Sequence, residues 1–247
     1  MPHPEGRVGI VPGLSPTDAS ASAPLTRTVP TPPMAHVAAL RARLAPARFE
    51  PYVTAAGSEP AALRLYEWNI AIAAAFHESL GQLEIVLRNG LDEQLRRWHR
   101  KTLDGDGAWH LDARTPLHPD LRAQIAQARG RLRSRRAIET RDRVVAELMF
   151  GFWRYLLDAR HQPTLWAPAL RHAFPHLRPR VRTDVYDRLV PLHALRNRIA
   201  HHEPIHHLPL SSRFEELLTL TGFVCPTTAT WIWSTTRIPA LLDSRPA

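Results

Sequence analysis

Cysteine and lysine are almost absent from the sequence. Cys225 is the single cysteine, which excludes a disulfide framework within the chain and a multi-cysteine zinc site. We therefore expect a reducing, cytoplasmic location, with Cys225 as a small buried hydrophobic residue rather than a catalytic thiol. Lys101 is the only lysine among 32 lysine and arginine residues, so nearly all of the positive charge is guanidinium, which pairs with phosphate through two N–H groups.

Long apolar runs are also missing. The longest candidate, residues 70–76, is short and rich in alanine, whereas a bilayer-spanning helix needs about 20 apolar residues. The N-terminus has neither a basic leader nor a continuous apolar stretch, so we expect no secretion signal and no membrane partner. Sustained two-residue alternation is absent too, which argues against a β-sheet.

The composition that is present suits a folded domain with an anionic partner. Hydrophobic residues make up 44% of the 247 residues, enough for a real core. The net charge of +9 favours polyanions, because each neutralised phosphate releases counterions. The abundance of arginine, alanine and proline also fits a genome-wide codon bias, so the charge alone does not identify RNA as the partner.

Composition and periodicity divide the chain into two parts. Residues 1–33 are rich in proline, serine, threonine and alanine and bury too little apolar surface to offset their ordering entropy. We expect a disordered tail there, or a mis-assigned start with Met34 as the alternative first residue. Residues 34–247 are expected to form a single helical domain.

Apolar residues recur every three or four positions through most of this domain, which predicts an all-α bundle with additional short C-terminal helices. Gly81 and Gly90 are positions at which the first long helix could bend. The buried face of the middle helix is expected to include Leu148, Met149 and Phe152. The predicted helices cover residues 59–100, 119–135, 141–158, 164–173, 181–201, 211–221 and 227–235.

The residues with the clearest chemical pattern lie at the end of the helix predicted over 181–201. Asn197 and His201 are four residues apart and share a helical face, and Arg196 is adjacent. A histidine that titrates near neutrality can take a proton from a ribose 2′-OH or give one to the leaving oxygen. An arginine can pair with the non-bridging phosphate oxygens as charge builds on phosphorus. These residues could therefore cleave RNA without a metal, although an exposed surface arginine is the commoner role at a helix end.

A second motif overlaps the first. His202, Glu203 and His206 match the His-Glu-x-x-His pattern of zinc peptidases, which requires a continuous helix. Pro204 interrupts such a helix, so the peptidase interpretation fails on backbone grounds. A metal-dependent hydrolase built on His201, His202, His206 and His207, or plain polar loop residues, stay open as alternatives.

Three sequence blocks, taken in order, resemble the Abi-like (abortive infection) branch of the HEPN superfamily of helical ribonucleases. The resemblance runs from about residue 45 to about residue 240, and Arg196, Asn197 and His201 match the Arg-Asn-x-x-x-His signature. The matching blocks are residues 65–69 with 76–80 and 83–89, residues 149–153, and residues 192–205.

This resemblance implies an all-α HEPN fold and a homodimer in which the motif helices of two protomers meet. It implies a metal-independent endoribonuclease with no cofactor, which leaves a 2′,3′-cyclic phosphate and a 5′-hydroxyl. The implied role is phage defence by abortive infection, or a toxin, with an antitoxin or phage-derived trigger as a further partner. Arg196, Asn197 and His201 are carried over as catalytic residues. Residues that could support them are Glu84, Arg88, Asn89, Arg198 and His202; for the first three, a buried structural salt bridge is an equal alternative.

A non-catalytic module that binds RNA or a protein partner is the competing hypothesis. The predicted helix over 119–135 and the residue after it carry a run of arginines that would form its RNA surface. A solvated helical face explains the same run equally well. The arginines in question are Arg129, Arg131, Arg133, Arg135 and Arg136.

Overall fold

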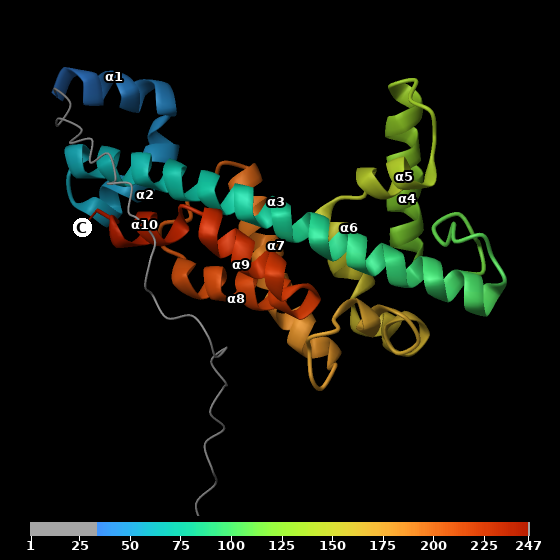
Figure 1. The fold of residues 1–247 in the computed structure, drawn as a ribbon. Helices are drawn as coiled ribbons and strands as arrows, with labels where there is room; N and C mark the ends of the chain where they lie inside the picture. The colour runs from blue at the N-terminus through green and yellow to red at the C-terminus, as the bar shows by residue number, and fades with distance from the viewer. Residues whose placement is uncertain (1–33, 247) are drawn as a thin grey trace, which may run out of the picture.

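The computed structural model describes residues 34–246, with side chains from Val37 onward, and in this part of the chain the protein is all-α with no strand (Figure 1). The all-α prediction is therefore confirmed, whereas the prediction of a disordered tail over residues 1–33 lies outside the described residues. The α-helices are α1 (Met34–Leu44), α2 (Pro46–Ala56), α3 (Glu59–Leu103), α4 (Pro119–Ser134), α5 (Arg141–Glu147), α6 (Phe150–Leu156), α7 (Arg182–Ala200), α8 (Leu210–Val224), α9 (Pro226–Thr235) and α10 (Ile238–Asp243). Three short helical turns connect α6 to α7: η1 (Ala159–His161), η2 (Gln162–Trp166) and η3 (Leu170–Ala173).

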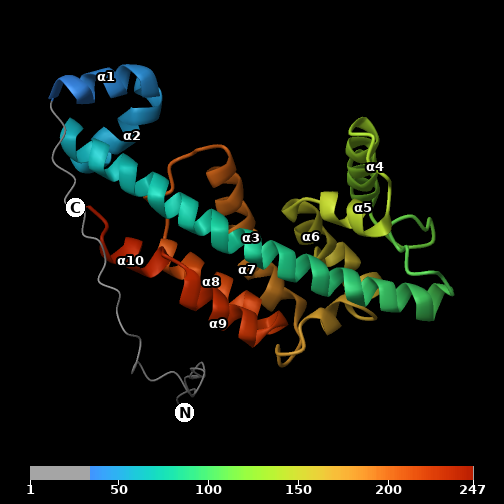
Figure 2. The same cartoon turned by 45° about the horizontal axis from the view of Figure 1, so that its top comes forward.

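The long helix α3 is the element against which the others pack. It begins at an N-cap, Ser58, whose hydroxyl accepts a hydrogen bond from the Ala61 N–H at 3.4 Å. Helices α8 and α10 lie along one side of it, α7 crosses it, and α4 and α5 lie near its C-terminal end (Figures 1 and 2). Most of the predicted apolar stripe of α3 is buried, with Leu83, Leu87 and Leu91 fully inaccessible, but Ile70, which belongs to the same predicted stripe, is 51% exposed. The helix predicted over 59–100 is thus confirmed, and neither glycine interrupts it.

Gly90 is instead a point of close approach between helices. A Cβ atom at Gly90 would lie 3.4 Å from the Val224 side chain and 3.7 Å from the Ala173 Cβ. The missing side chain therefore lets α8 and η3 come close to α3.

The single helix predicted over 141–158 is wrong in its middle. Leu148 and Met149 have extended backbones, with ψ of 121° and 163°, so α5 ends before them and α6 begins after them. The break changes which side chains face the core: Phe150 is buried, whereas Met149, predicted to be buried, is 56% exposed. A continuous helix would point residues 148 and 150 in nearly opposite directions, because each residue turns the helix by about 100°.

Other parts of the chain were predicted in outline or missed. The predicted helix over 164–173 is two separate turns, η2 and η3. Helices α2 and α10 had no prediction; α10 is tied to α3 by the indole N–H of Trp68, which donates to the Leu241 carbonyl at 2.6 Å. Cys225 is half-buried rather than buried, and it precedes α9 as its N-cap residue.

By length and composition alone, α3 would also qualify as a membrane-spanning helix. The absence of a long uninterrupted apolar run predicted no membrane-spanning helix, so the two criteria disagree for α3. A single such helix is weak support for a membrane location, since the core helix of a soluble protein passes the same test.

His110, in the segment between α3 and α4, is buried, and neither of its ring nitrogens has a hydrogen-bond partner among residues 37–246. Burial, reinforced by Arg96, Arg129 and Arg141, lowers its pKa from 6.5 to about 4. Below pH 6.5 the unfolded chain binds a proton that the folded chain rejects, so stability falls as the pH drops toward 4.

We expect the substitution His110→Leu to abolish this part of the acid sensitivity. Wild type should lose about 3 kcal/mol more than the variant between pH 7 and pH 4, because each pKa unit corresponds to about 1.4 kcal/mol. Urea unfolding at several pH values measures the difference. Parallel stability curves for the two proteins would contradict the prediction.

Candidate functional site

The end of α7 is closed by a Schellman motif. The Glu203 N–H donates to the Arg198 carbonyl at 2.8 Å, and the His202 N–H donates to the Ile199 carbonyl at 3.0 Å. His202 has a φ of 54°, the left-handed conformation that glycine usually supplies at this position. Its carbonyl accepts a hydrogen bond from Arg48 at 2.7 Å, which ties the turn to α2. The predicted end of the helix before Pro204 is confirmed, and His202, predicted as a supporting residue, acts here through its backbone.

His201 is the C-cap residue of α7, and its side chain is exposed. Its N–H donates to the Asn197 carbonyl at 3.0 Å, so the helical relation between these two residues holds to the end. Arg196 and Asn197 are half-buried one turn earlier. All three residues predicted to be catalytic therefore lie at one helix end, and none is sequestered in the core.

His193 extends this row by one turn and was not singled out from the sequence. Its Nε2 lies 3.5 Å from the Asn197 side-chain amide, and its ring packs against Phe150 and Tyr155 of α6. A Cβ atom at Gly151 would come within 3.1 Å of this nitrogen, so the glycine makes room for the imidazole. The signal was available in the sequence, since residues 193, 197 and 201 repeat at the four-residue spacing of a helical face.

Burial also sets the protonation state of His193. Desolvation, with the positive charges of Arg154 and Arg196, lowers the pKa of its imidazole. The lowered pKa favours the neutral imidazole, the form that can accept a proton from a hydroxyl group as a general base does.

Glu84 on α3 faces the same helix end. Burial raises the pKa of its carboxyl group, and Arg196, then Arg88, the Phe150 backbone N–H and His77, oppose that shift. These neighbours show that the folded chain brings the block around Glu84 to the predicted catalytic arginine, although more than 100 residues separate them in sequence.

The salt bridge considered as an alternative role for Glu84 is not formed. No carboxylate of residues 37–246 lies within 4 Å of the guanidinium groups of Arg196 or Arg88. Arg88 donates instead to Asn89 at 3.3 Å, and Arg198 pairs with Glu203 at 3.3 Å. Of the arginines on the last turns of α7, Arg196 is thus the one that has no anionic partner within the described chain.

Asn69 holds the loop that follows the helix end. Its side-chain oxygen accepts hydrogen bonds from the backbone N–H groups of Ile205 and His206, at 2.8 and 3.0 Å. Asn69 is 5% exposed, so the two donors would have no water to replace it. These hydrogen bonds connect the sequence block at residues 65–69 to the segment that follows the motif on α7.

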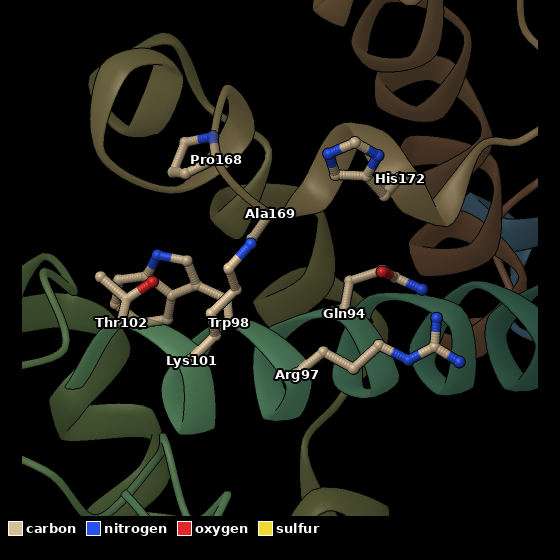
Figure 3. Close-up of a pocket in the computed structure, with 8 residues that line it drawn as sticks. All are labelled: Gln94, Arg97, Trp98, Lys101, Thr102, Pro168, Ala169 and His172. Atoms are coloured by element: carbon tan, nitrogen blue, oxygen red, sulfur yellow. The ribbon is translucent and has the colours of Figure 1, made fainter. Parts of the chain in front are cut away.

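A groove of about 580 Å³ runs beside the helix end, between α3 and the turn after α7. His77 and Ile70 contribute to it from α3, and Ala200, His202 and Glu203 from the other side. The side chains of Arg196, Asn197 and His201 do not line the groove, so they flank it rather than form its wall. A larger cavity, of about 610 Å³, lies near the other end of α3 (Figure 3).

The arginines predicted to bind RNA are partly neutralised within the protein. Arg129 pairs with Glu139 at 2.5 Å, and Arg131 and Arg135 share Glu147 at 3.0 and 2.7 Å. Arg133 lies 3.8 Å from Glu139, and Arg136 has no ion pair within the described residues. Two carboxylates offset five guanidinium groups. The surface therefore stays basic, but fewer of its guanidinium groups are free to bind RNA than the sequence suggests.

The histidines after α7 do not converge on a common point. His206 is buried against the ring of Tyr52, at a centroid distance of 4.9 Å, whereas His201, His202 and His207 are exposed. Over residues 37–246, no group of three or more histidine, cysteine, aspartate or glutamate side chains could hold a metal ion.

No family model of known proteins matches the chain, and no curated protein or solved structure matches it either.

Proposed function

We propose that the protein is a metal-independent endoribonuclease of the HEPN type, with Arg196, Asn197 and His201 as its catalytic residues. One observation carries the proposal: at the solvent-accessible end of α7, an arginine without an anionic partner among residues 37–246 lies five residues before an exposed histidine. Phosphodiester cleavage through a 2′-hydroxyl uses these two types of group: a cation for the phosphate and an imidazole for proton transfer. The resemblance to Abi-like proteins supports the same activity, with phage defence or toxicity as the cellular role.

The reaction needs only groups that this chain supplies. The His201 imidazole removes the proton of the 2′-hydroxyl, and the oxygen attacks phosphorus while the bond to the 5′-oxygen breaks. The imidazolium then gives this proton to the leaving 5′-oxygen, directly or through water, which leaves a 2′,3′-cyclic phosphate and a 5′-hydroxyl end. Arg196 pairs with the non-bridging phosphate oxygens. The Asn197 side chain contacts the His193 ring and orients that imidazole.

A homodimer is part of the proposal. Two copies of the α7 end, placed face to face, would line one cleft with two Arg196–His201 sets. The exposed position of His201 and the apolar residues Ile70 and Ile85 on the same side of α3, about half exposed, are compatible with such a pairing. A non-catalytic RNA-binding module is the alternative, and the basic surface of α4 favours it.

The direct test is cleavage of single-stranded RNA in the presence of EDTA. We expect the purified protein to cut RNA and to leave cyclic phosphate ends, because neither nucleophile nor acid comes from a metal. A substrate with deoxyribose at the cleaved position should resist by at least about 10³-fold, since its nucleophile is missing. Equal cutting of the deoxy substrate would contradict the proposed chemistry, and binding without cutting would favour the non-catalytic alternative.

A further inference from the structure

The cavity between α3 and the segment 168–172 has a lining that is distinct from the candidate catalytic site. Its α3 side presents one helical face, with positions three and four residues apart (Figure 3). The Lys101 side chain extends across the cavity toward Ala169, and His172 lies opposite Gln94 and Arg97 (Figure 3). The polar and aromatic residues of the lining are Gln94, Arg97, Trp98, Lys101, Thr102 and His172.

Most of the polar groups around this cavity have no hydrogen-bond partner in the described chain. Arg97 pairs with Glu93, one turn earlier on α3. By contrast, no carboxylate of residues 37–246 lies within 4 Å of the Lys101 ammonium, and the Gln94 amide and the Thr102 hydroxyl make no hydrogen bond there. A ligand could thus be bound without first breaking contacts of the protein.

The chemistry of these groups selects an anion that also carries an aromatic ring. No acidic residue lines the cavity, and Lys101 supplies a free positive charge that reaches into it. The half-buried indole of Trp98 adds a flat aromatic surface, on which any nucleobase can stack. An amide, a hydroxyl and an imidazole around it can hydrogen-bond to a ribose or a base edge.

We propose that this cavity binds a nucleoside phosphate, with the phosphate on Lys101 and the base on Trp98. The ligand is either a free nucleotide or one nucleotide of a bound RNA strand, and the two sources share this chemistry. The α3 side of the cavity lies roughly 15–27 Å along the helix from Glu84, from Gln94 to Thr102, since a helix rises about 1.5 Å per residue, so it is separate from the end of α7. The proposal does not depend on RNA cleavage.

Calorimetric titration of the full-length protein with AMP, and with inorganic phosphate, tests the free-ligand form. A single-stranded RNA that carries 2′-O-methyl riboses, which cannot be cleaved, tests the strand form by fluorescence anisotropy. The variants are Lys101→Met, which removes an exposed charge, and Trp98→Leu, with circular dichroism to check that each folds. Arg64→Gln is the matched control, because Arg64 is exposed on the same helix, lies outside the cavity and has no ion pair in the described chain.

We expect Lys101→Met to weaken binding of AMP or of the RNA by at least about tenfold, as the loss of a charge-assisted contact would. Trp98→Leu should weaken the same ligand by at least about fivefold, and Arg64→Gln should leave its binding within about twofold. An effect on AMP identifies a free nucleotide as the ligand, and an effect on RNA alone identifies a strand.

Two results would overturn the proposal. One is binding of both AMP and RNA that is the same in Lys101→Met as in wild type. The other is equal affinity for phosphate and AMP with no effect of Trp98→Leu, because the base would then make no contact. If Trp98→Leu does not fold, Trp98→Phe replaces it; that variant keeps an aromatic face and should retain most of the binding, and its loss would contradict stacking.

Discussion

Substitution of His201 by alanine is expected to lower the rate of RNA cleavage by about 10³-fold, within the range of about 10²–10⁴ that general acid–base catalysis contributes. The side chain is exposed at the C-cap of α7 and makes no hydrogen bond with the described residues, so its loss removes chemistry rather than packing. The free energy of unfolding should stay within about 0.5 kcal/mol of wild type. Single-turnover cleavage and urea unfolding of the same preparation measure both quantities.

Arg196 offers a graded version of this experiment. Arg196→Ala should cost about 10²–10³-fold in cleavage rate, the range found when one donor to a developing oxyanion is removed. Arg196→Lys keeps the charge but loses the planar pair of N–H donors, so its rate should fall between those of wild type and the alanine variant. A single-turnover rate that is the same in Arg196→Lys and Arg196→Ala would show that the charge itself contributes nothing.

Matched controls come from residues of the same type elsewhere on the surface. His176 is exposed and has no side-chain hydrogen bond in the described chain, so His176→Ala should cleave RNA at the wild-type rate. Arg64→Gln serves the same purpose for Arg196. Unchanged RNA decay in both His201→Ala and Arg196→Ala would point to a contaminating nuclease and would refute the assignment.

Asn69→Leu is expected to be the most destabilising polar-to-apolar change near the site. The substitution keeps the approximate size of the side chain but removes the oxygen that accepts from the Ile205 and His206 N–H groups. Each buried donor left unpaired costs about 1–3 kcal/mol, so the unfolding free energy should fall by about 2–6 kcal/mol, or the loop should detach locally. Because this loop follows directly after His201, cleavage should also slow, although the Asn69 side chain hydrogen-bonds to none of the three proposed catalytic residues.

Hydrogen exchange distinguishes the two outcomes for Asn69→Leu. Global destabilisation raises exchange throughout the core, whereas a local release raises it at residues 205 and 206 and leaves α3 protected. Asn89→Leu is a control for stability alone, because Asn89 is exposed on the same helix. A variant at Asn69 as stable as wild type, with protected loop amides, would contradict the role of this side chain.

The three- and four-residue spacing of apolar residues predicted much of the fold. The apolar stripe predicted α3 because its three- and four-residue spacing recurs over the whole segment that becomes buried. The prediction of one continuous helix over residues 141–158 was wrong. The apolar spacing around Leu148 allows such a helix, and only the packing of the folded chain shows that Phe150 faces the core. The short helix α10 has too few residues for a periodic signal, and its contact with Trp68 comes from the far end of the described chain.

The candidate site was likewise predicted only in part from the sequence. Local sequence determined that Arg196, Asn197 and His201 lie at one helix end, because Pro204 and the four-residue spacing are properties of neighbouring residues. Tertiary structure alone decided that Glu84 faces Arg196, that Asn69 holds the following loop, and that the arginines of α4 share two carboxylates. These contacts join residues that are distant in the chain, or depend on how one helix is rotated against another. Side-chain packing sets both, and the pattern of a single segment does not record them.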